Sequence, residues 1–184
     1  MKPKILFIQG AMEGAYKEDA LMVDEIKKTL GAEFSFIYPE MPHEEKPDYM
    51  AWSRFIDDVI QKEKGIPYLI GHSIGGSVLI KYLSEENPGN IKSAFILSAP
   101  FWGKSKDWEW KEVELKDNAC ERLQKIPHLL FYQASDDEIT PAQHVQYYKE
   151  KIPQSHIEIF DTGGHQLKNQ LKHVAKDIRE IAGK

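Results

Sequence analysis

The sequence is poor in cysteine and has no long apolar run. Cys120 is the single cysteine among 184 residues, so the chain forms no internal disulfide, and we assign this thiol no role. No stretch approaches the roughly 20 apolar residues of a membrane-spanning helix. The apolar part of residues 1–10 is too short for a signal peptide and suits a first strand better. These absences predict a cytoplasmic protein with no membrane partner.

A strong excess of one charge is also missing. The chain carries 24 Lys and Arg against 29 Asp and Glu, a net charge of −5, which argues against a nucleic-acid-binding surface. Charge clusters such as residues 44–46 mix both signs and are typical of solvated faces. The composition, 41% hydrophobic and 29% charged, is ordinary for a globular protein. We therefore expect one domain, residues 1–184, and no nucleic-acid partner.

The glycine-rich stretch at residues 71–76 lacks the features of two nucleotide-binding motifs. Ser73 stands where G-x-G-x-x-G requires its middle glycine, and Ser77 follows Gly76 where a P-loop requires lysine. Nor does any predicted element carry two histidines with a third ligand at metal-binding spacing. The sequence therefore predicts neither a metal nor a cofactor.

Short apolar runs alternate with helical patterns along the chain, which is typical of a parallel α/β sheet. Strands are predicted at residues 4–9, 34–38, 67–70, 91–98, 127–133 and 156–160. Helices are predicted at residues 17–30, 48–63, 74–83, 142–151 and 167–181. The irregular stretch at residues 99–125, which follows the fourth strand, is predicted to be a short cap-like insert.

Residues 71–75 read Gly-His-Ser-Ile-Gly and match the pattern G-x-S-x-G. An apolar strand precedes them and a helical pattern follows, which is the context of a nucleophile elbow. So sharp a turn strains the backbone at Ser73 and leaves no space for side chains at the flanking glycines. Ser73 is therefore the predicted nucleophile; the alternative is a tight turn whose serine has no catalytic role.

A candidate acid and a candidate base follow the elbow. Asp136 and Asp137 come directly after the fifth predicted strand, and His165 comes after the sixth, in a Gly-Gly-His turn. Because parallel strands bring their carboxyl ends to one edge of a sheet, these side chains are expected near Ser73. His165 is the predicted general base, and both aspartates are candidates for the acid that orients it. His72 cannot fold back onto Ser73 and is expected to pack or to donate a supporting hydrogen bond.

These motifs resemble those of the α/β-hydrolases, and the small size resembles the compact serine hydrolases of the retinoblastoma-binding protein 9 and YdeN-like group. The matching stretches are residues 9–12, 71–75, 136–141 and 163–165. The resemblance implies a single-domain, six-stranded, mostly parallel sheet of order 2-1-3-4-5-6 with helices on both faces. It also selects Asp137, four positions before Pro141, as the acid.

The resemblance further implies an oxyanion hole formed by two backbone amides. Ile74, which follows the nucleophile, supplies one amide. Ala11 supplies the second, with Met12 as the alternative. Gln9 stands where the family has histidine; because the donor is backbone, this difference bears on how the loop is held and not on the chemistry.

The sequence thus predicts a carboxylesterase-like serine hydrolase that cleaves a small acyl ester or a related bond through an acyl-enzyme. Three aromatic residues of the insert, Phe101, Trp102 and Trp108, are predicted to bind substrate together with Met12. The alternative is that these aromatic residues only pack the insert onto the sheet. A second hypothesis from another class is a catalytically silent binding or interaction protein on the same scaffold, with a protein partner that the sequence does not identify.

Overall fold

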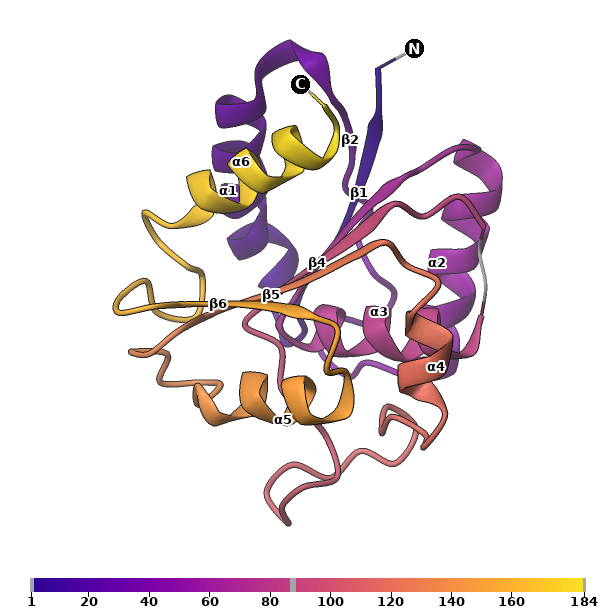
Figure 1. Cartoon of the computed structure of the whole chain (residues 1–184), viewed down its shortest axis with the longest axis vertical. Helices are drawn as coiled ribbons and strands as arrows, with labels where there is room; N and C mark the ends of the chain where they lie inside the picture. The colour runs from indigo at the N-terminus through magenta and orange to yellow at the C-terminus, as the bar shows by residue number, and fades with distance from the viewer. Residues whose placement is uncertain (1, 87–88, 184) are drawn as a thin grey trace.

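Six parallel strands form the centre of the molecule in the order β2-β1-β3-β4-β5-β6 (Figure 1). The computed structural model describes residues 2–86 and 89–183. The strands are β1 (Lys4–Ile8), β2 (Ser35–Ile37), β3 (Tyr68–His72), β4 (Ser93–Leu97), β5 (His128–Ala134) and β6 (His156–Phe160). The predicted fold class and strand order are confirmed, and every strand pairing is parallel.

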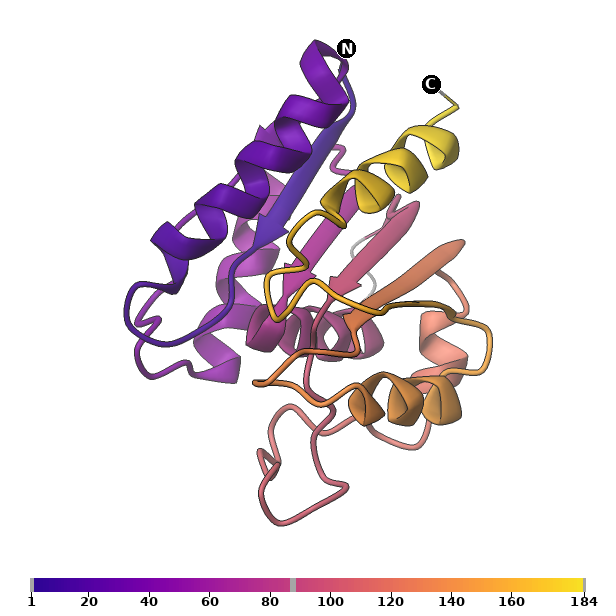
Figure 2. The same ribbon diagram turned by 90° about the vertical axis from the view of Figure 1, so that its left-hand side faces the viewer.

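Helices cover both faces of the sheet in two unequal groups (Figures 1 and 2). Helices α1 (Ala15–Leu30) and α6 (Leu171–Ile181) pack together on one face and bury the inward side chains of β1, β3 and β5. The other face carries α2 (Tyr49–Glu63), α3 (Ser73–Glu85), α4 (Ala119–Leu123) and α5 (Gln143–Lys151). No helix within the described ranges has both the length and the apolar character needed to cross a membrane.

Two elements differ from the sequence-based expectation. The last helix begins at Leu171 and not at residue 167, because turns occupy the preceding residues and Leu167 and Asn169 take left-handed φ values of 51° and 68°. The insert, expected to be irregular, contains the short helix α4. Its buried residues Ala119 and Leu123 belong to the same core as the inward face of α3, which explains why this one turn of the insert is ordered as helix.

The parallel arrangement brings the carboxyl ends of the strands to one edge of the sheet, where α/β folds bind their ligands. The segments that follow β1, β3, β5 and β6 all begin there. They carry residues 9–12, Ser73, Asp137 and His165, respectively. The fold therefore gathers the predicted site residues at one edge.

The turn between β3 and α3 has no connecting loop, since β3 ends at His72 and α3 begins at Ser73. Ser73 has a φ of 52°, a left-handed conformation that costs a residue with a side chain roughly 1–2 kcal/mol. The end of β1 packs directly on the first turn of α3. A Cβ added at Gly75 would lie 1.9 Å from the carbonyl oxygen of Gln9, so only glycine fits there.

Gly75→Ala is expected to lower the free energy of unfolding by at least about 3 kcal/mol, the upper part of the usual range for overpacking. The methyl group fits only if the carbonyl of Gln9 moves, and because this carbonyl belongs to the backbone, the loop after β1 must move with it. Urea unfolding followed by circular dichroism measures the effect. Gly65→Ala is the control, because its added Cβ meets nothing within 4 Å and only its left-handed backbone resists the change, at about 1–2 kcal/mol. Equal losses in the two variants would contradict the close packing at Gly75.

Candidate active site

A cleft of about 210 Å³ opens at the carboxyl edge of the sheet. Its wall includes Ser73 and His165 together with residues 10–12 of the loop after β1. The insert contributes Trp108, and the loop after β5 contributes Ile139. Four segments that are far apart in the sequence thus meet around one serine.

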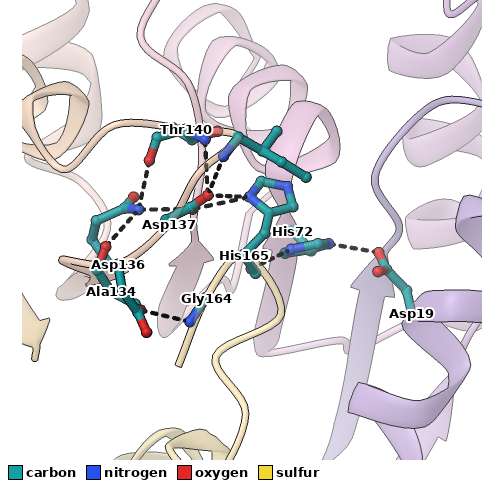
Figure 3. Close-up of polar contacts among 10 residues, drawn as sticks. Asp19, His72, Ala134, Asp136, Asp137, Thr140, Gly164 and His165 are labelled. Carbon is teal, nitrogen blue, oxygen red and sulfur yellow. Dashed lines mark hydrogen bonds and ion pairs between the residues drawn. The ribbon is translucent and has the colours of Figure 1, made fainter. Parts of the chain in front are cut away.

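The imidazole of His165 pairs with the carboxylate of Asp137 at the back of this cleft (Figure 3). Nδ1 of His165 lies 2.9 Å from Oδ2 and 3.2 Å from Oδ1 of Asp137. The amides of Ile139 and Thr140 each donate to Oδ1 at 2.9 Å, and Nε2 of Gln133 donates to Oδ2 at 2.9 Å. Burial raises the pKa of Asp137, but the hydrogen bonds from His165 and the two amides outweigh burial and hold the pKa below its usual value. The carboxylate is therefore ionised at neutral pH.

Asp136 has a different position from its neighbour. It is exposed, and its Oδ1 accepts a hydrogen bond from the amide of Gly164 at 2.8 Å (Figure 3). Asp136 thus holds the loop that carries His165, whereas Asp137 faces the His165 ring. This difference distinguishes two adjacent carboxylates that residue type alone does not separate.

Ser73 is half-buried and lines the cleft at the N-terminus of α3. The amide of Ile74 lies in the first turn of this helix, where amides have no partner within the helix. Among the hydrogen bonds of the described residues, none joins the Ser73 hydroxyl to the His165 ring. Catalytic hydrogen bonds are often long in enzymes without substrate and shorten when substrate binds, so the missing hydrogen bond does not exclude His165 as the base for Ser73.

The loop after β1 is held by the side chain of Gln9. Its Nε2 donates to Oε2 of Glu44 at 2.5 Å, and its Oε1 accepts from the amide of Met41 at 3.0 Å. The amide of Met12 donates to the carbonyl of Glu44 at 2.7 Å. The glutamine that stands in place of the family's histidine therefore has a definite structural role, and the Met12 amide is already engaged.

Glu44 is one residue of this region whose role was not predicted from the sequence. It was expected on a solvated face, but its carboxylate also accepts from the amides of Gly14 and Tyr16 at the start of α1, both at 2.8 Å. Burial raises the pKa of Glu44, and these hydrogen bonds outweigh it and lower the pKa. Glu44 lies 30 residues from Gly14 in the sequence, and no local pattern signals the contact.

The His72 side chain does not contact the Ser73 hydroxyl, as expected for the residue that directly precedes Ser73 in the chain. Its ring is buried and lies between Oδ2 of Asp19 and the carbonyl oxygen of His165, at 2.8 and 3.0 Å (Figure 3). The sequence predicted either packing or a supporting hydrogen bond for His72, and the structure shows hydrogen-bond contacts. Its partner Asp19 was not predicted, although this acid stands in the apolar stripe of α1 formed by Ala15, Met22 and Ile26.

The four predicted substrate-binding residues divide into two groups. Met12 and Trp108 line the cleft, whereas Phe101 and Trp102 are not among its lining residues. Phe101 is buried against Tyr148, with ring centroids 5.0 Å apart. Trp102 packs edge-on against both Trp108 and another tryptophan of the insert, at 5.6 and 5.5 Å. Of the three aromatic residues, Trp108 thus lines the cleft, whereas Phe101 packs on α5 and Trp102 packs within the insert.

Comparisons with known proteins agree with this architecture. Residues 50–124 match the model of the Hydrolase_4 family, described as serine aminopeptidase S33. No curated protein shows significant similarity to the sequence.

Solved structures resemble the chain over nearly its whole length. An esterase from Exiguobacterium antarcticum superposes with a TM-score of 0.70 at 14% identity, over 99% of this chain and 92% of the esterase. A serine hydrolase from the bacterium Cycloclasticus zankles gives 0.76 at 13% identity, over 99% and 90% of the two chains. Est1E from Butyrivibrio proteoclasticus gives 0.73 at 16% identity, over 100% and 89%. At these identities the likeness is one of fold.

Proposed function

We propose that this chain, which has the α/β-hydrolase fold, is a serine hydrolase that cleaves a small acyl ester or a related bond through an acyl-enzyme. The observation that carries the proposal is the cleft shared by Ser73 and His165, with Asp137 on the far side of the His165 ring. This is the order of groups needed to activate a serine hydroxyl. The family match over residues 50–124 and the esterases among the structural relatives support the same reaction class.

In the proposed acylation step, the Ser73 oxygen attacks the ester carbonyl while Nε2 of His165 takes the hydroxyl proton. Asp137 accepts the hydrogen bond from Nδ1, which fixes the tautomer and stabilises the imidazolium. The tetrahedral intermediate then collapses: the ester bond breaks, and the leaving alcohol takes the proton from His165. Water follows the same route in the second step, and its attack on the acyl-enzyme releases the acid and restores Ser73.

The charge that develops on the carbonyl oxygen requires two amide donors. Ile74 supplies one amide from the first turn of α3, where the helix dipole also favours negative charge. Ala11 is the proposed second donor. The amide of Met12 is committed to the carbonyl of Glu44 at 2.7 Å, and the described hydrogen bonds include none from the Ala11 amide. These two facts favour Ala11 over the alternative that the sequence left open.

A small acyl group fits the proposed site better than a long one. The cleft measures about 210 Å³, below the roughly 300–1,000 Å³ of typical small-molecule pockets. Met12 and Ile139 present apolar side chains there, with exposed fractions of 65% and 58%, and Trp108 adds an aromatic wall. We therefore propose carboxylesterase-like specificity for short acyl chains.

Trp108→Ala is expected to raise KM for p-nitrophenyl butyrate roughly 5- to 30-fold, a loss of about 1–2 kcal/mol of binding energy, and to change kcat little. The physical reason is the loss of one apolar wall of the cleft. Trp110→Ala is the matched control: it removes an indole that packs on Trp102 in the same insert and does not line the cleft. Equal changes in KM for the two variants would show that the insert acts only through its folding.

The proposed function is tested by pre-steady-state hydrolysis of p-nitrophenyl esters from acetate to dodecanoate. The expected result is a burst of one p-nitrophenol per chain followed by slower turnover, with kcat/KM highest for the shortest acyl groups. Efficiency that rises steadily to dodecanoate would contradict the small acyl site. Neither burst nor turnover with any ester would contradict the enzyme and favour the catalytically silent binding protein.

A further inference from the structure

The lining of the cleft includes two buried titratable side chains that the proposed reaction does not use. Asp19 on α1 and His72 at the end of β3 are each only 2% exposed. Oδ2 of Asp19 lies 2.8 Å from Nδ1 of His72. An unpaired carboxylate in such a place is strongly unfavourable, so the contact with His72 accounts for the presence of an acid on the apolar face of α1.

The two ring nitrogens of His72 both face hydrogen-bond acceptors. Nδ1 meets the Asp19 carboxylate, and Nε2 meets the backbone carbonyl of His165 at 3.0 Å. A neutral imidazole has only one N–H to donate, whereas an imidazolium has two. With Asp19 ionised, both contacts are hydrogen bonds only if His72 carries a proton on each nitrogen.

The charges around His72 agree with this protonation state. Burial lowers the pKa of His72, but Asp19 from α1 and Asp137 from the loop after β5 outweigh burial and raise the pKa. The other titratable group that faces the ring is His165, whose own ring centroid lies 4.8 Å away. Two carboxylates thus favour the imidazolium.

The same carboxylate oxygen also holds the loop after β1. Oδ2 of Asp19 accepts the amide of Gly10 at 2.7 Å. A Cβ added at Gly10 would lie 3.3 Å from Cβ of Ser73 and 3.5 Å from Nδ1 of His72, so this loop is packed against both residues. Ala11, the proposed oxyanion donor, is the next residue.

We propose that the Asp19–His72 pair is a positioning device that joins the oxyanion loop to the loop of the catalytic histidine. One hydrogen-bonded chain runs from the Gly10 amide through Asp19 and His72 to the His165 carbonyl. Figure 3 shows the part of this chain from Asp19 to His165. Both ends of the chain are backbone atoms. One is the amide of Gly10, which precedes the proposed oxyanion donor Ala11, and the other is the carbonyl of the proposed base His165. This inference rests on the proposed function, and it assigns Asp19 and His72 roles that act through Ala11 and His165.

Asp19→Asn tests the chain of hydrogen bonds with little change in shape. Gly10 and His72 both contact the same atom of Asp19, Oδ2. In the Asp19→Asn variant either a nitrogen or an oxygen takes the place of Oδ2. The nitrogen cannot accept from the Gly10 amide, so that contact is lost. The oxygen is uncharged, so His72 becomes neutral and no longer donates to the His165 carbonyl. His72→Phe keeps a ring in the same space and removes both donors. A shift of about 1 Å in catalytic geometry costs on the order of 100-fold, so kcat for p-nitrophenyl acetate is expected to fall about 10- to 100-fold while KM stays within about threefold.

Asp177→Asn is the control for a purely structural role. Asp177 on α6 accepts a 2.6 Å hydrogen bond from the hydroxyl of the buried Tyr132, on the face of the sheet away from the insert. Its substitution is expected to lower the melting temperature and leave kcat unchanged. If Asp19→Asn and His72→Phe lose no more kcat than Asp177→Asn, or raise KM while keeping kcat, the positioning role is wrong. An inactive wild type would instead overturn the proposed function.

Nitrogen-15 NMR of the wild-type imidazoles is a readout that does not depend on activity or on the folding of any variant. We expect one ring to keep a proton on both nitrogens at pH 8, where exposed histidines are neutral. The signal should be absent from His72→Phe, which assigns it, or be assigned by ring-to-backbone correlations if that variant fails to fold. A neutral His72 at pH 8 would overturn the proposal.

Discussion

Ser73→Ala is expected to remove at least about 1,000-fold of the activity on p-nitrophenyl esters, because the members of a catalytic triad act as a unit and the loss of one removes most of their joint effect. Without the hydroxyl, no acyl-enzyme forms, so the burst of p-nitrophenol should also disappear. The melting temperature should stay near that of the wild type, because Ser73 lines the cleft and its hydroxyl makes no described hydrogen bond to the His165 ring that the substitution would break. Steady-state and stopped-flow kinetics measure both effects.

Ser84→Ala is the matched control for the nucleophile. It removes a serine hydroxyl from the same helix, where Oγ donates to the carbonyl of Lys81 at 2.7 Å and lies outside the cleft. We expect full activity from this variant. Activity of Ser73→Ala within a few fold of the control would contradict the mechanism, and the search for the nucleophile would have to start elsewhere.

Asp137→Asn is expected to lower kcat by about 10,000-fold, the loss that the same replacement causes in a serine protease triad. The amide cannot favour the imidazolium, and in one orientation it donates to Nδ1 and imposes the wrong tautomer on His165. The carboxylate is held in its present place by the amides of Ile139 and Thr140, so the substitution should leave the loop in position. Steady-state hydrolysis of p-nitrophenyl acetate measures the loss.

Asp136→Asn provides the comparison within the same loop. Asp136 contacts the Gly164 amide and not the His165 ring, and an asparagine oxygen can still accept that hydrogen bond. We expect a loss of less than about tenfold, because one surface hydrogen bond contributes only about 0.5–1.5 kcal/mol. Comparable losses for the two variants would indicate a shared role, and the reverse order would transfer the role of the acid to Asp136.

Much of the fold could be predicted from the sequence because it depends on short-range patterns. Apolar runs located all six strands to within a few residues, and the alternation with helices indicated a parallel sheet. The strand order came from the resemblance and not from the periodicity. The start of the last helix was missed, because left-handed residues such as Leu167 and Asn169 carry no marker when they are not glycine.

Site residues could be predicted where a local motif fixes the backbone. They could not be predicted where the contact joins residues far apart in the sequence. The elbow located Ser73 because its glycines mark a close approach of strand and helix, and the Gly-Gly-His turn located His165 because both of its glycines take positive φ. Glu44 was missed, since its partners at the start of α1 are 28 and 30 residues away. Asp19 had a signal that could have been used: an acid in an otherwise apolar helical stripe requires a buried partner. The orientation of Trp102 and Trp108 depended on packing within the insert, which no local pattern determines.

The proposed mechanism requires a reactive hydroxyl at Ser73, and labelling with a fluorophosphonate probe measures this reactivity without any choice of substrate. The wild-type protein is incubated with the probe, and its intact mass and tryptic peptides are determined by mass spectrometry. We predict the addition of one probe per chain on the peptide that contains Ser73, with no addition to Ser73→Ala. Absence of labelling in the folded wild-type protein, or labelling at another residue, would contradict the central claim.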